Sequence, residues 1–252
     1  MANELSGRAA LITGAGGGIG RAAALAVAGA GAFVGVHYHS SEAAAADTLR
    51  AIESAGGKGV LLRGDISREA EANSVVEQFV QRAGRLDVLF NNAGTPLDRS
   101  KLEDCPTELW LANFQVNVHG AFFVTRRAIP ALRKSGKGSV INNLSLAVQT
   151  GGANGAGPYA AAKGALHVMT RTLARELAPQ VRVNAIMPGV VETRHHEMFS
   201  TQERMEQYRK ETPLGRNAVA EEVGNVVLFL ASDASSFMTG TLLDVNGGRF
   251  LR

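Results

Sequence analysis

Short apolar runs of strand length alternate along the whole chain with longer segments of helical period. The apolar runs cover Ala9–Thr13, Ala32–Tyr38, Gly59–Leu62, Leu86–Asn91, Ser139–Leu144, Val181–Met187 and Leu242–Val245. The helical segments between them cover Ala22–Ala28, Glu42–Ser54, Glu69–Ala83, Glu108–Leu132, Tyr159–Ala178 and Val219–Ser232. This alternation predicts βαβ units and hence a parallel sheet.

Several of the predicted strands, such as Leu86–Asn91, are apolar on both faces, which is typical of a sheet covered by helices on both sides. With right-handed crossovers the pattern predicts an α/β fold, a Rossmann-type doubly wound sheet of seven parallel strands flanked by helices on both faces. The length of 252 residues fits a single domain spanning residues 1–252.

Two stretches depart from this regular pattern. Residues 194–215 are polar and lie between Pro188-Gly189 and Pro213, so we expect a small substrate lobe or lid there. Glu108–Leu132 is long enough for two helices or for one bent helix.

Charge and cysteine content exclude several classes of protein. With 26 basic and 23 acidic side chains the net charge is only +3, and the arginines are scattered, so we expect no nucleic-acid partner. The single cysteine, Cys105, excludes an intrachain disulfide and a cysteine-based metal site. No matching cluster of carboxylates or cysteines surrounds His195-His196, so no metal is expected. Because there is neither a targeting sequence nor a membrane segment, we expect a cytoplasmic protein without a membrane partner.

A glycine-rich turn follows the first predicted strand and leads into a helix. Its residues are Gly14, Ala15, Gly16, Gly17, Gly18, Ile19 and Gly20. Backbone amides at a helix start can bind a pyrophosphate, and glycines allow the phosphate to come close. The spacing is G-x-x-x-G-x-G rather than G-x-G-x-x-G, so a plain glycine turn is the competing interpretation.

The sequence Tyr159-Ala-Ala-Ala-Lys163 places a phenol and an ammonium on one helix face. A neighbouring ammonium favours the phenolate and thereby lowers the tyrosine pKa, which suits acid–base chemistry. Ser145 ends another apolar run, at the sheet edge where ligands of parallel sheets bind. The competing interpretations are an exposed Tyr-Lys pair and a serine that only caps a turn.

Taken together, these motifs resemble the short-chain dehydrogenase/reductase family, most closely its 3-oxoacyl-[acyl-carrier-protein] reductase-like ketoreductases. The resemblance covers nearly the whole chain. It is carried by Thr13–Gly20, Asp65-Ile66, Asn91-Asn92-Ala93-Gly94, Asn117, Ser145, Tyr159 with Lys163, Pro188–Thr193 and Leu243–Gly248. Two features depart from the family pattern. Leu144 replaces a common serine or glycine, and one extra residue separates Ser145 from Tyr159, so we expect a different substrate loop.

The resemblance implies an oxidoreductase that transfers a hydride between a nicotinamide cofactor and a carbonyl or secondary alcohol. It implies that Tyr159 is the general acid/base, Lys163 lowers its pKa and binds the nicotinamide ribose, Ser145 orients the carbonyl, and Asn117 bends its helix and holds a relay water. It assigns cofactor contacts to Gly14, Gly16, Gly17, Gly18, Ile19, Gly20, Asp65, Ile66, Asn92, Ala93, Gly94, Tyr159, Lys163, Pro188, Gly189, Val191 and Thr193.

The end of the second predicted strand indicates which dinucleotide binds. NAD enzymes place an acidic residue there, which repels the additional phosphate of NADP. Here Tyr38 occupies that place, and His39, Ser40 and Ser41 can donate hydrogen bonds to a 2′-phosphate. Because Gly17 stands where many NADP enzymes carry a base, we expect a modest preference for NADP, with NAD as the alternative.

Three kinds of function fit these motifs to different degrees. We favour the NADP-dependent reductase over an NAD-dependent alcohol dehydrogenase of the same family. A non-catalytic dinucleotide sensor and a structural subunit are disfavoured because the catalytic residues are all present. Neither loop around the site identifies the substrate, and an acyl-carrier substrate is not favoured over a free ketone. The resemblance also implies a homotetramer, in which Ala121, Ala128 and Ala174 would allow close helix approach and the tail ending at Leu251 would be covered.

Overall fold

A seven-stranded parallel sheet forms the centre of the computed structural model, which describes residues 4–193 and 201–251. The strands run in the spatial order β3-β2-β1-β4-β5-β6-β9. Their bounds are β1 Ala9–Ile12, β2 Phe33–Tyr38, β3 Lys58–Arg63, β4 Val88–Asn91, β5 Gly138–Asn143, β6 Val181–Pro188 and β9 Leu242–Val245. Every neighbouring pair is parallel, so the predicted doubly wound fold is confirmed.

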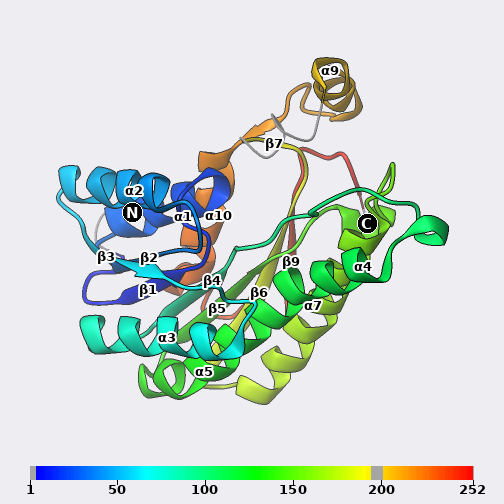
Figure 1. Cartoon of the computed structure of the whole chain (residues 1–252). Coiled ribbons are helices and arrows are strands. Elements are labelled where there is room, and N and C mark those ends of the chain that lie inside the picture. Colours follow the sequence, from blue (N-terminus) through cyan, green and yellow to red (C-terminus); the bar gives the residue numbers. More distant parts are fainter. Residues whose placement is uncertain (1–3, 194–200, 252) are drawn as a thin grey trace.

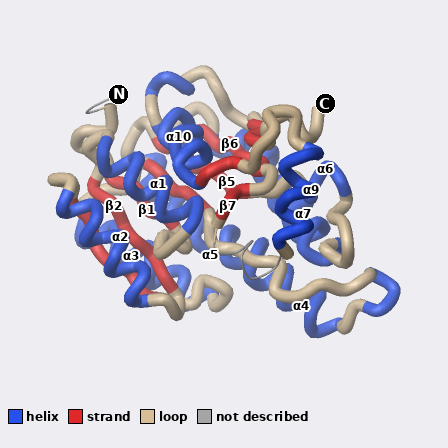
Figure 2. Tube along the Cα trace, turned by 90° about the horizontal axis from the view of Figure 1, so that it is seen from above, coloured by secondary structure: helices blue, strands red, loops and turns tan. Residues whose placement is uncertain are grey.

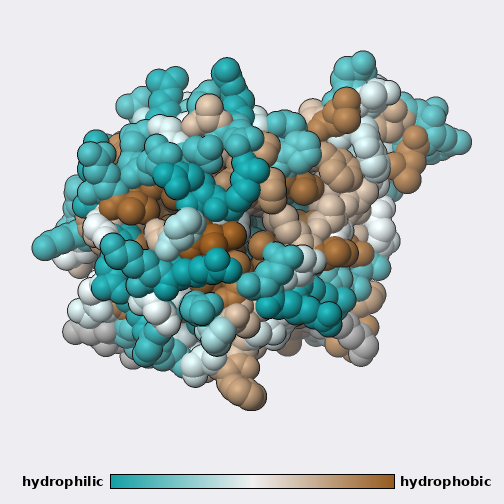
Figure 3. Space-filling view, turned by 90° about the horizontal axis from the view of Figure 1, so that it is seen from below, coloured by the Kyte–Doolittle hydropathy of each residue, from teal (hydrophilic) through white to brown (hydrophobic). Residues whose placement is uncertain are grey.

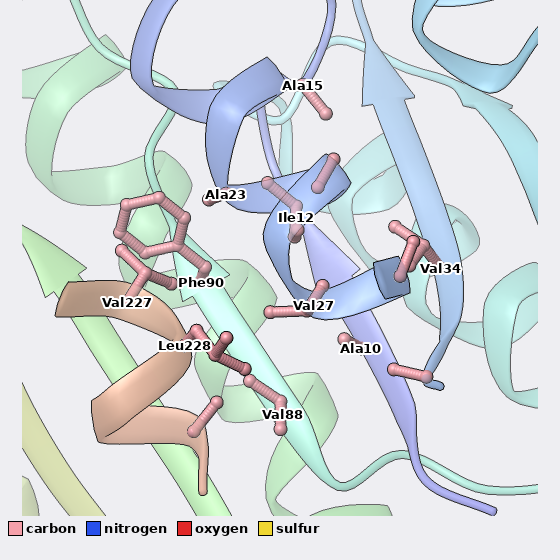
Figure 4. Close-up of a cluster of buried hydrophobic side chains, with 14 of the residues drawn as sticks. Ala10, Ile12, Ala15, Ala23, Val27, Val34, Val88, Phe90, Val227 and Leu228 are labelled. Atoms are coloured by element: carbon pink, nitrogen blue, oxygen red, sulfur yellow. The ribbon is translucent and has the colours of Figure 1, made fainter. Parts of the chain in front are cut away.

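Helices cover both faces of this sheet (Figure 1). One layer contains α1 (Gly18–Gly29), α2 (Glu42–Ser54) and α10 (Ala220–Ala231), and the other contains α3 (Glu69–Ala83), α5 (Gly120–Lys134) and α7 (Gly157–Leu177). Strand β1 shows why both layers form. Its alternate residues Ala10 and Ile12 pack toward α1 and α10, as Figure 4 shows, whereas Ala9 and Leu11 pack toward α3 and α5.

The segment predicted as two helices or one bent helix consists of three helical pieces in direct succession. Helix α4 (Thr107–Phe114) is followed by a π-helical turn, η2 (Gln115–His119), and then by α5. The side-chain amide of Asn117 donates to the carbonyl of Asn113 at 3.0 Å, four residues earlier. This side-chain bond uses a carbonyl of the helix ladder, and the backbone widens into the π turn at the same place.

Only part of the predicted lobe at 194–215 can be described, because residues 194–200, with His195 and His196, lie outside the described residues. The rest contains α9 (Gln202–Glu211) and the segment that follows it. A parallel pair of two-residue strands, β7 (Val191–Glu192) and β8 (Ala218–Val219), joins the two ends of this insertion. Seen from above, α9 lies over the end of the molecule that carries α6 (Ala147–Thr150) and α7 (Figure 2).

The alanines expected at subunit contacts face the interior instead. Ala121, Ala128 and Ala174 are each at most 5% exposed and belong to the buried clusters of the chain. The prediction of close helix approach through these alanines is therefore wrong, because their small side chains already serve packing within the chain. None of the helices in the described part of the chain is both long and apolar enough to cross a bilayer.

Candidate active site

The glycine turn after β1 is held in a shape that only glycine allows at two of its positions. Gly14 and Gly18 have φ angles of +64° and +50°, in the left-handed region. At Gly20, an added Cβ atom would lie 2.2 Å from the carbonyl oxygen of Gly14 and 2.5 Å from Nδ2 of Asn92. The turn and the helix therefore touch backbone to backbone, which explains why α1 begins at Gly18 and not at Ala22 as expected.

The N-terminus of α1 fits an anion. Gly17 precedes the helix in an extended, exposed conformation, no side chain caps the helix, and its first turn contains no acidic residue. Its first amides and the helix dipole therefore favour a phosphate group at this place. The methyl group of Thr193 lies 3.2 Å from where a Cβ atom on Gly18 would be, so the residue predicted for the carboxamide lies against the turn.

The four residues expected to select the dinucleotide lie at the end of β2 and differ in their exposure to solvent. Tyr38 is only 7% exposed and packs in the apolar cluster beneath α1, whereas His39, Ser40 and Ser41 are exposed. Asp65 and Ile66 follow β3, and Ile66 is buried against Gly120. Hydrogen bonds from Ser67 outweigh the opposing effect of burial and hold the pKa of Asp65 below its usual range.

A histidine that the sequence analysis did not select supports the glycine turn. His37 on β2 is buried, its Nδ1 accepts from the amide of Gly14 at 3.1 Å, and its Nε2 lies 3.0 Å from the carbonyl oxygen of Gly64. Burial lowers the pKa of His37 to about 4, so the ring is neutral at pH 7. The two backbone partners fix the tautomer, since an amide can only donate and a carbonyl can only accept. No periodicity or spacing in the sequence could have indicated this role.

Tyr159 in the first turn of α7 meets Ser145 beyond the end of β5. A hydrogen bond joins the two hydroxyl groups, and Ser145 Oγ also accepts from the amide of Ala147 at 3.1 Å. Lys163, one turn further along α7, is 2% exposed, and its Nζ atom lies 5.7 Å from the centroid of the Tyr159 ring. The structure thus brings the three predicted catalytic side chains together.

The expected lowering of the tyrosine pKa is not found. Burial raises the pKa of Tyr159 to about 12, opposed only by the hydrogen bond with Ser145. Burial also lowers the pKa of Lys163 to about 8. Each group is driven toward its neutral form because both are removed from water, and the ammonium that should stabilise a phenolate is itself disfavoured.

Asn117 and Lys163 converge over a glycine. A Cβ atom on Gly94 would lie 2.5 Å from Asn117 Oδ1 and 3.0 Å from Lys163 Nζ. Asn117 Nδ2 donates to the carbonyl of Thr95 at 2.8 Å, but its buried Oδ1 has no hydrogen-bond partner among the residues that the structure describes. An unpartnered buried acceptor beside an amine and a bare glycine fits a bound water or ligand hydroxyl.

A chain of hydrogen bonds connects this amine with the glycine turn. Asn92 Nδ2 donates to the carbonyls of Thr13 and Gly14 at 3.0 and 3.1 Å. Asn143 Nδ2 donates to Asn92 Oδ1 at 3.0 Å, and Lys163 Nζ donates to the Asn143 carbonyl at 2.7 Å. Asn143 was not predicted as a site residue, because an amide within an apolar strand is read as a buried structural group. Asn92 is engaged by the protein itself, so Ala93 and Gly94 remain for direct cofactor contact.

The remaining predicted residues lie at the same edge of the sheet. Pro188 ends β6, and the amide of Gly189 donates to the carbonyl of Val245 at 3.0 Å. A Cβ atom on Gly189 would lie 2.9 Å from Cα of Asn246, so this position requires a small residue. Val191 is 3% exposed and packs in the core, which leaves its backbone for a ligand contact.

The lowered pKa of Lys163 predicts that Lys163→Met stabilises the protein near neutral pH. An amine with a pKa of about 8 in the folded chain and about 10.4 when unfolded disfavours folding most below pH 8, and this penalty vanishes as the pH rises through 10.4. After subtraction of the lost hydrogen bond to Asn143, we expect a gain of about 1–2 kcal/mol at pH 7. Urea unfolding of both proteins at pH 7 and pH 10 measures this difference in the free energy of unfolding.

The gain should shrink or reverse at pH 10, because both states then approach the neutral amine. Lys134→Met provides the control, since Lys134 is exposed at the end of α5 and should give no comparable pH dependence. A Lys163→Met variant that is less stable than the wild type at pH 7 would contradict the burial argument.

The chain matches known proteins over nearly its whole length. The family model described as "Enoyl-(Acyl carrier protein) reductase" matches residues 14–249. The 3-oxoacyl-[acyl-carrier-protein] reductase FabG of Thermotoga maritima is 39% identical over 250 residues, which cover 97% of this chain and 98% of that protein.

Solved structures show the same architecture. An NADH-dependent reductase, A1-R′, responsible for alginate metabolism superposes with a TM-score of 0.91 at 36% identity and covers 99% of this chain and 100% of its own. A 7α-hydroxysteroid dehydrogenase, complexed with NADH and 7-oxo glycochenodeoxycholic acid, gives a TM-score of 0.92 at 31% identity, with coverage of 98% and 96%. These matches support a nicotinamide cofactor. The chain is therefore an oxidoreductase that belongs to the short-chain dehydrogenase/reductase family.

Proposed function

We propose that this protein reduces the carbonyl group of a small molecule with NADPH, and that Tyr159 is the proton donor. The observation that carries the proposal is the contact between the hydroxyls of Ser145 and Tyr159 at the carboxyl edge of the sheet, with Lys163 buried beside them. A nicotinamide, when bound, supplies the hydride, and the protein provides position and proton transfer.

The cofactor would be held along one edge of the sheet. The amides at the start of α1 and the glycine turn suit its phosphates, and His39, Ser40 and Ser41 lie exposed where the adenosine ribose is expected. Ala93, Gly94 and Thr193 line the path from the glycine turn to Tyr159. His37 and Asn92 hold this surface in shape through their hydrogen bonds to Gly14.

The protonation state of Tyr159 favours reduction. With a pKa of about 12 the phenol carries its proton at pH 7 and can donate it to a carbonyl oxygen as negative charge develops there. Ser145 donates a second hydrogen bond to the same oxygen. Asn117 Oδ1 and Lys163 Nζ converge over Gly94, so a water accepted by Oδ1 can pass a proton from the Lys163 ammonium to Tyr159.

Replacing Tyr159 by phenylalanine tests the mechanism. The substitution leaves the ring in place and removes only the proton donor, so we expect kcat to fall by about 10²- to 10⁴-fold. NADPH oxidation with a panel of ketones measures the rate, and NADPH fluorescence on binding provides the control for an intact cofactor site. Turnover that survives the substitution undiminished would exclude the mechanism. A wild type that binds NADPH without turning over any carbonyl would favour the dinucleotide sensor instead.

The preference for NADP follows from the absence of a carboxylate at Tyr38, where NAD enzymes bind the ribose hydroxyls. Of the similar solved structures, one is an NADH-dependent reductase and another is a dehydrogenase complexed with NADH, which supports the alternative of an NAD-dependent enzyme. We favour NADP because His39, Ser40 and Ser41 all present hydrogen-bond donors to solvent beyond Tyr38, and because Glu42 already belongs to α2.

Tyr38→Asp should reverse the preference. The wild type should show a higher kcat/KM with NADPH than with NADH, because the exposed donors suit a phosphate. An aspartate at this position repels the 2′-phosphate and should favour NADH. Since Tyr38 is buried, Tyr38→Asn is the matched control: it removes the same ring without adding charge, and only the aspartate should invert the ratio. Equal or faster turnover with NADH in the wild type would contradict a preference for NADPH set by the residues at the end of β2.

We also propose a homotetramer. Large apolar side chains are exposed on helices α4, α5 and α7, namely Leu111, Phe122 and Val168, and Leu251 near the C-terminus is 80% exposed. Apolar patches also interrupt the hydrophilic surface seen from below in Figure 3. A second copy of the chain would cover such surfaces through isologous contacts. Light scattering that gives the mass of a monomer at micromolar concentration would refute this assembly.

A further inference from the structure

Two guanidinium groups hold the tip of the loop that connects Ser145 with Tyr159. Nη1 of Arg99 donates to the carbonyls of Ala153 and Asn154 at 3.2 and 3.3 Å. The guanidinium of Arg204, on α9, faces the Asn154 side-chain amide. With the amide oxygen turned toward the arginine, as its donors require, Oδ1 accepts from Nη1 at 2.8 Å and also contacts Nη2. One arginine comes from the segment after β4 and the other from the lobe, so both sides of the loop tip carry positive charge.

Neither of these charges is neutralised by an ion pair. Within residues 4–193 and 201–251, no carboxylate pairs with Arg99 or Arg204, although most arginines near the lobe have such a partner. The carboxylates next to them in sequence form hydrogen bonds with other groups. Asp98 accepts from the backbone amide of Arg99, and Glu203 is an exposed residue that hydrogen-bonds Thr201. Half-buried cations with only neutral partners favour the approach of an anion.

Arg204 is also held in a fixed position. Its Nε atom donates to the hydroxyl of Tyr208, one turn along α9. The Tyr208 ring also contacts Arg249, whose guanidinium lies 4.3 Å from the ring centroid and is itself paired with Glu211. Because Nε of Arg204 is engaged by Tyr208, its terminal nitrogens are directed toward Asn154. A guanidinium positioned in advance binds a carboxylate at a smaller loss of side-chain entropy.

The loop brings these charges near the reacting groups. Ser145 and Tyr159 touch, so residues 146–158 form a closed loop with its tip near Asn154. Asn154 lies three residues before α7, and Tyr159 is the third residue of that helix. Chain geometry therefore limits the Cα separation of Asn154 and Tyr159 to about 16 Å. The side chain of an arginine and a small substrate can cover this distance together.

We propose that the substrate is a small oxo acid whose carboxylate binds Arg204 and Arg99 while its carbonyl binds Ser145 and Tyr159. The proposal rests on the carbonyl reduction proposed above and specifies the substrate class. A small molecule is favoured over an acidic carrier protein, because both arginines are half-buried and contact the loop formed by residues 146–158.

The experiment compares oxo acids of increasing chain length with their methyl esters, which keep the carbonyl and lose the charge. We expect the wild type to favour the acid of the best pair by about 10- to 100-fold in kcat/KM, the range for a charge-assisted pair of hydrogen bonds. Arg204→Gln should abolish most of this acid-over-ester ratio, and Arg99→Gln should reduce the ratio as well.

Arg209→Gln is the matched control. Arg209 lies on the same helix but pairs with Glu192 and Glu206, so its loss should not change the ratio. An acid-over-ester ratio near one in the wild type, or a ratio unchanged in Arg204→Gln, would overturn the proposal. The proposal would also be overturned if the wild type turned over β-oxoacyl thioesters faster than every oxo acid tested.

Ligand-observed NMR separates this proposal from the proposed reaction. If no carbonyl is reduced but the oxo acid still binds the wild type and binds Arg204→Gln at least 10-fold more weakly, the anion site stands and the reductase activity does not. If reduction proceeds and neither binding nor rate depends on Arg204, the reductase stands and the anion site is refuted.

Discussion

The side chain of Asn92 makes the hydrogen bonds on which the rest of the site depends. Its Nδ2 atom holds the carbonyls of Thr13 and Gly14, and its Oδ1 atom accepts from Asn143. One amide thereby connects the ends of β1, β4 and β5 at the edge where a doubly wound sheet binds its ligand. The contact is so close that a Cβ atom on Gly20 would lie 2.5 Å from Nδ2 of Asn92. A glycine at position 20 therefore leaves room for this side chain and for the carbonyl oxygen of Gly14, which would lie 2.2 Å from the same Cβ atom.

The groups proposed for catalysis extend from this connection into the buried interior. The carbonyl of Asn143 receives Lys163, and Asn117 lies across Gly94 from the same amine. Burial explains both pKa shifts, because it disfavours the charged form of either group. A protonated phenol and a weakly basic amine suit a site that must donate a proton and then recover it. Burial of the Lys163 amine also disfavours folding, so this residue lowers the free energy of unfolding of the chain.

The sequence predicted the sheet well, because strand and helix periods differ and the apolar runs are long. All seven strands and both layers follow from that pattern, and the helices Glu42–Ser54 and Glu69–Ala83 have the predicted bounds. That Ser145, Tyr159 and Lys163 lie together was also predictable, since their spacing is distinctive. His37 and Asn143 were not, because a polar residue inside an apolar strand carries no spacing signal and its partners come from distant segments. The pKa of Tyr159 was misjudged for a similar reason: the sequence shows the neighbouring lysine but not how far the pair is removed from water.

The groups proposed for chemistry and for substrate selection belong to parts of the fold that are built differently. Ser145, Lys163 and Asn117 are tied to the sheet and to long, packed helices. In contrast, α9 buries none of its side chains, and Arg204 is oriented by neighbours in the lobe and by the loop before α7. A helix with so little buried surface contributes little to the stability of the core, so changes there alter the charge at the loop tip without disturbing the amides that hold Lys163. This separation explains why the sequence is specific about the reaction class and uninformative about the substrate. The side chains proposed for the reaction are placed by contacts within the core, whereas the partners of those proposed for substrate selection become known only when the lobe and the loop are seen together.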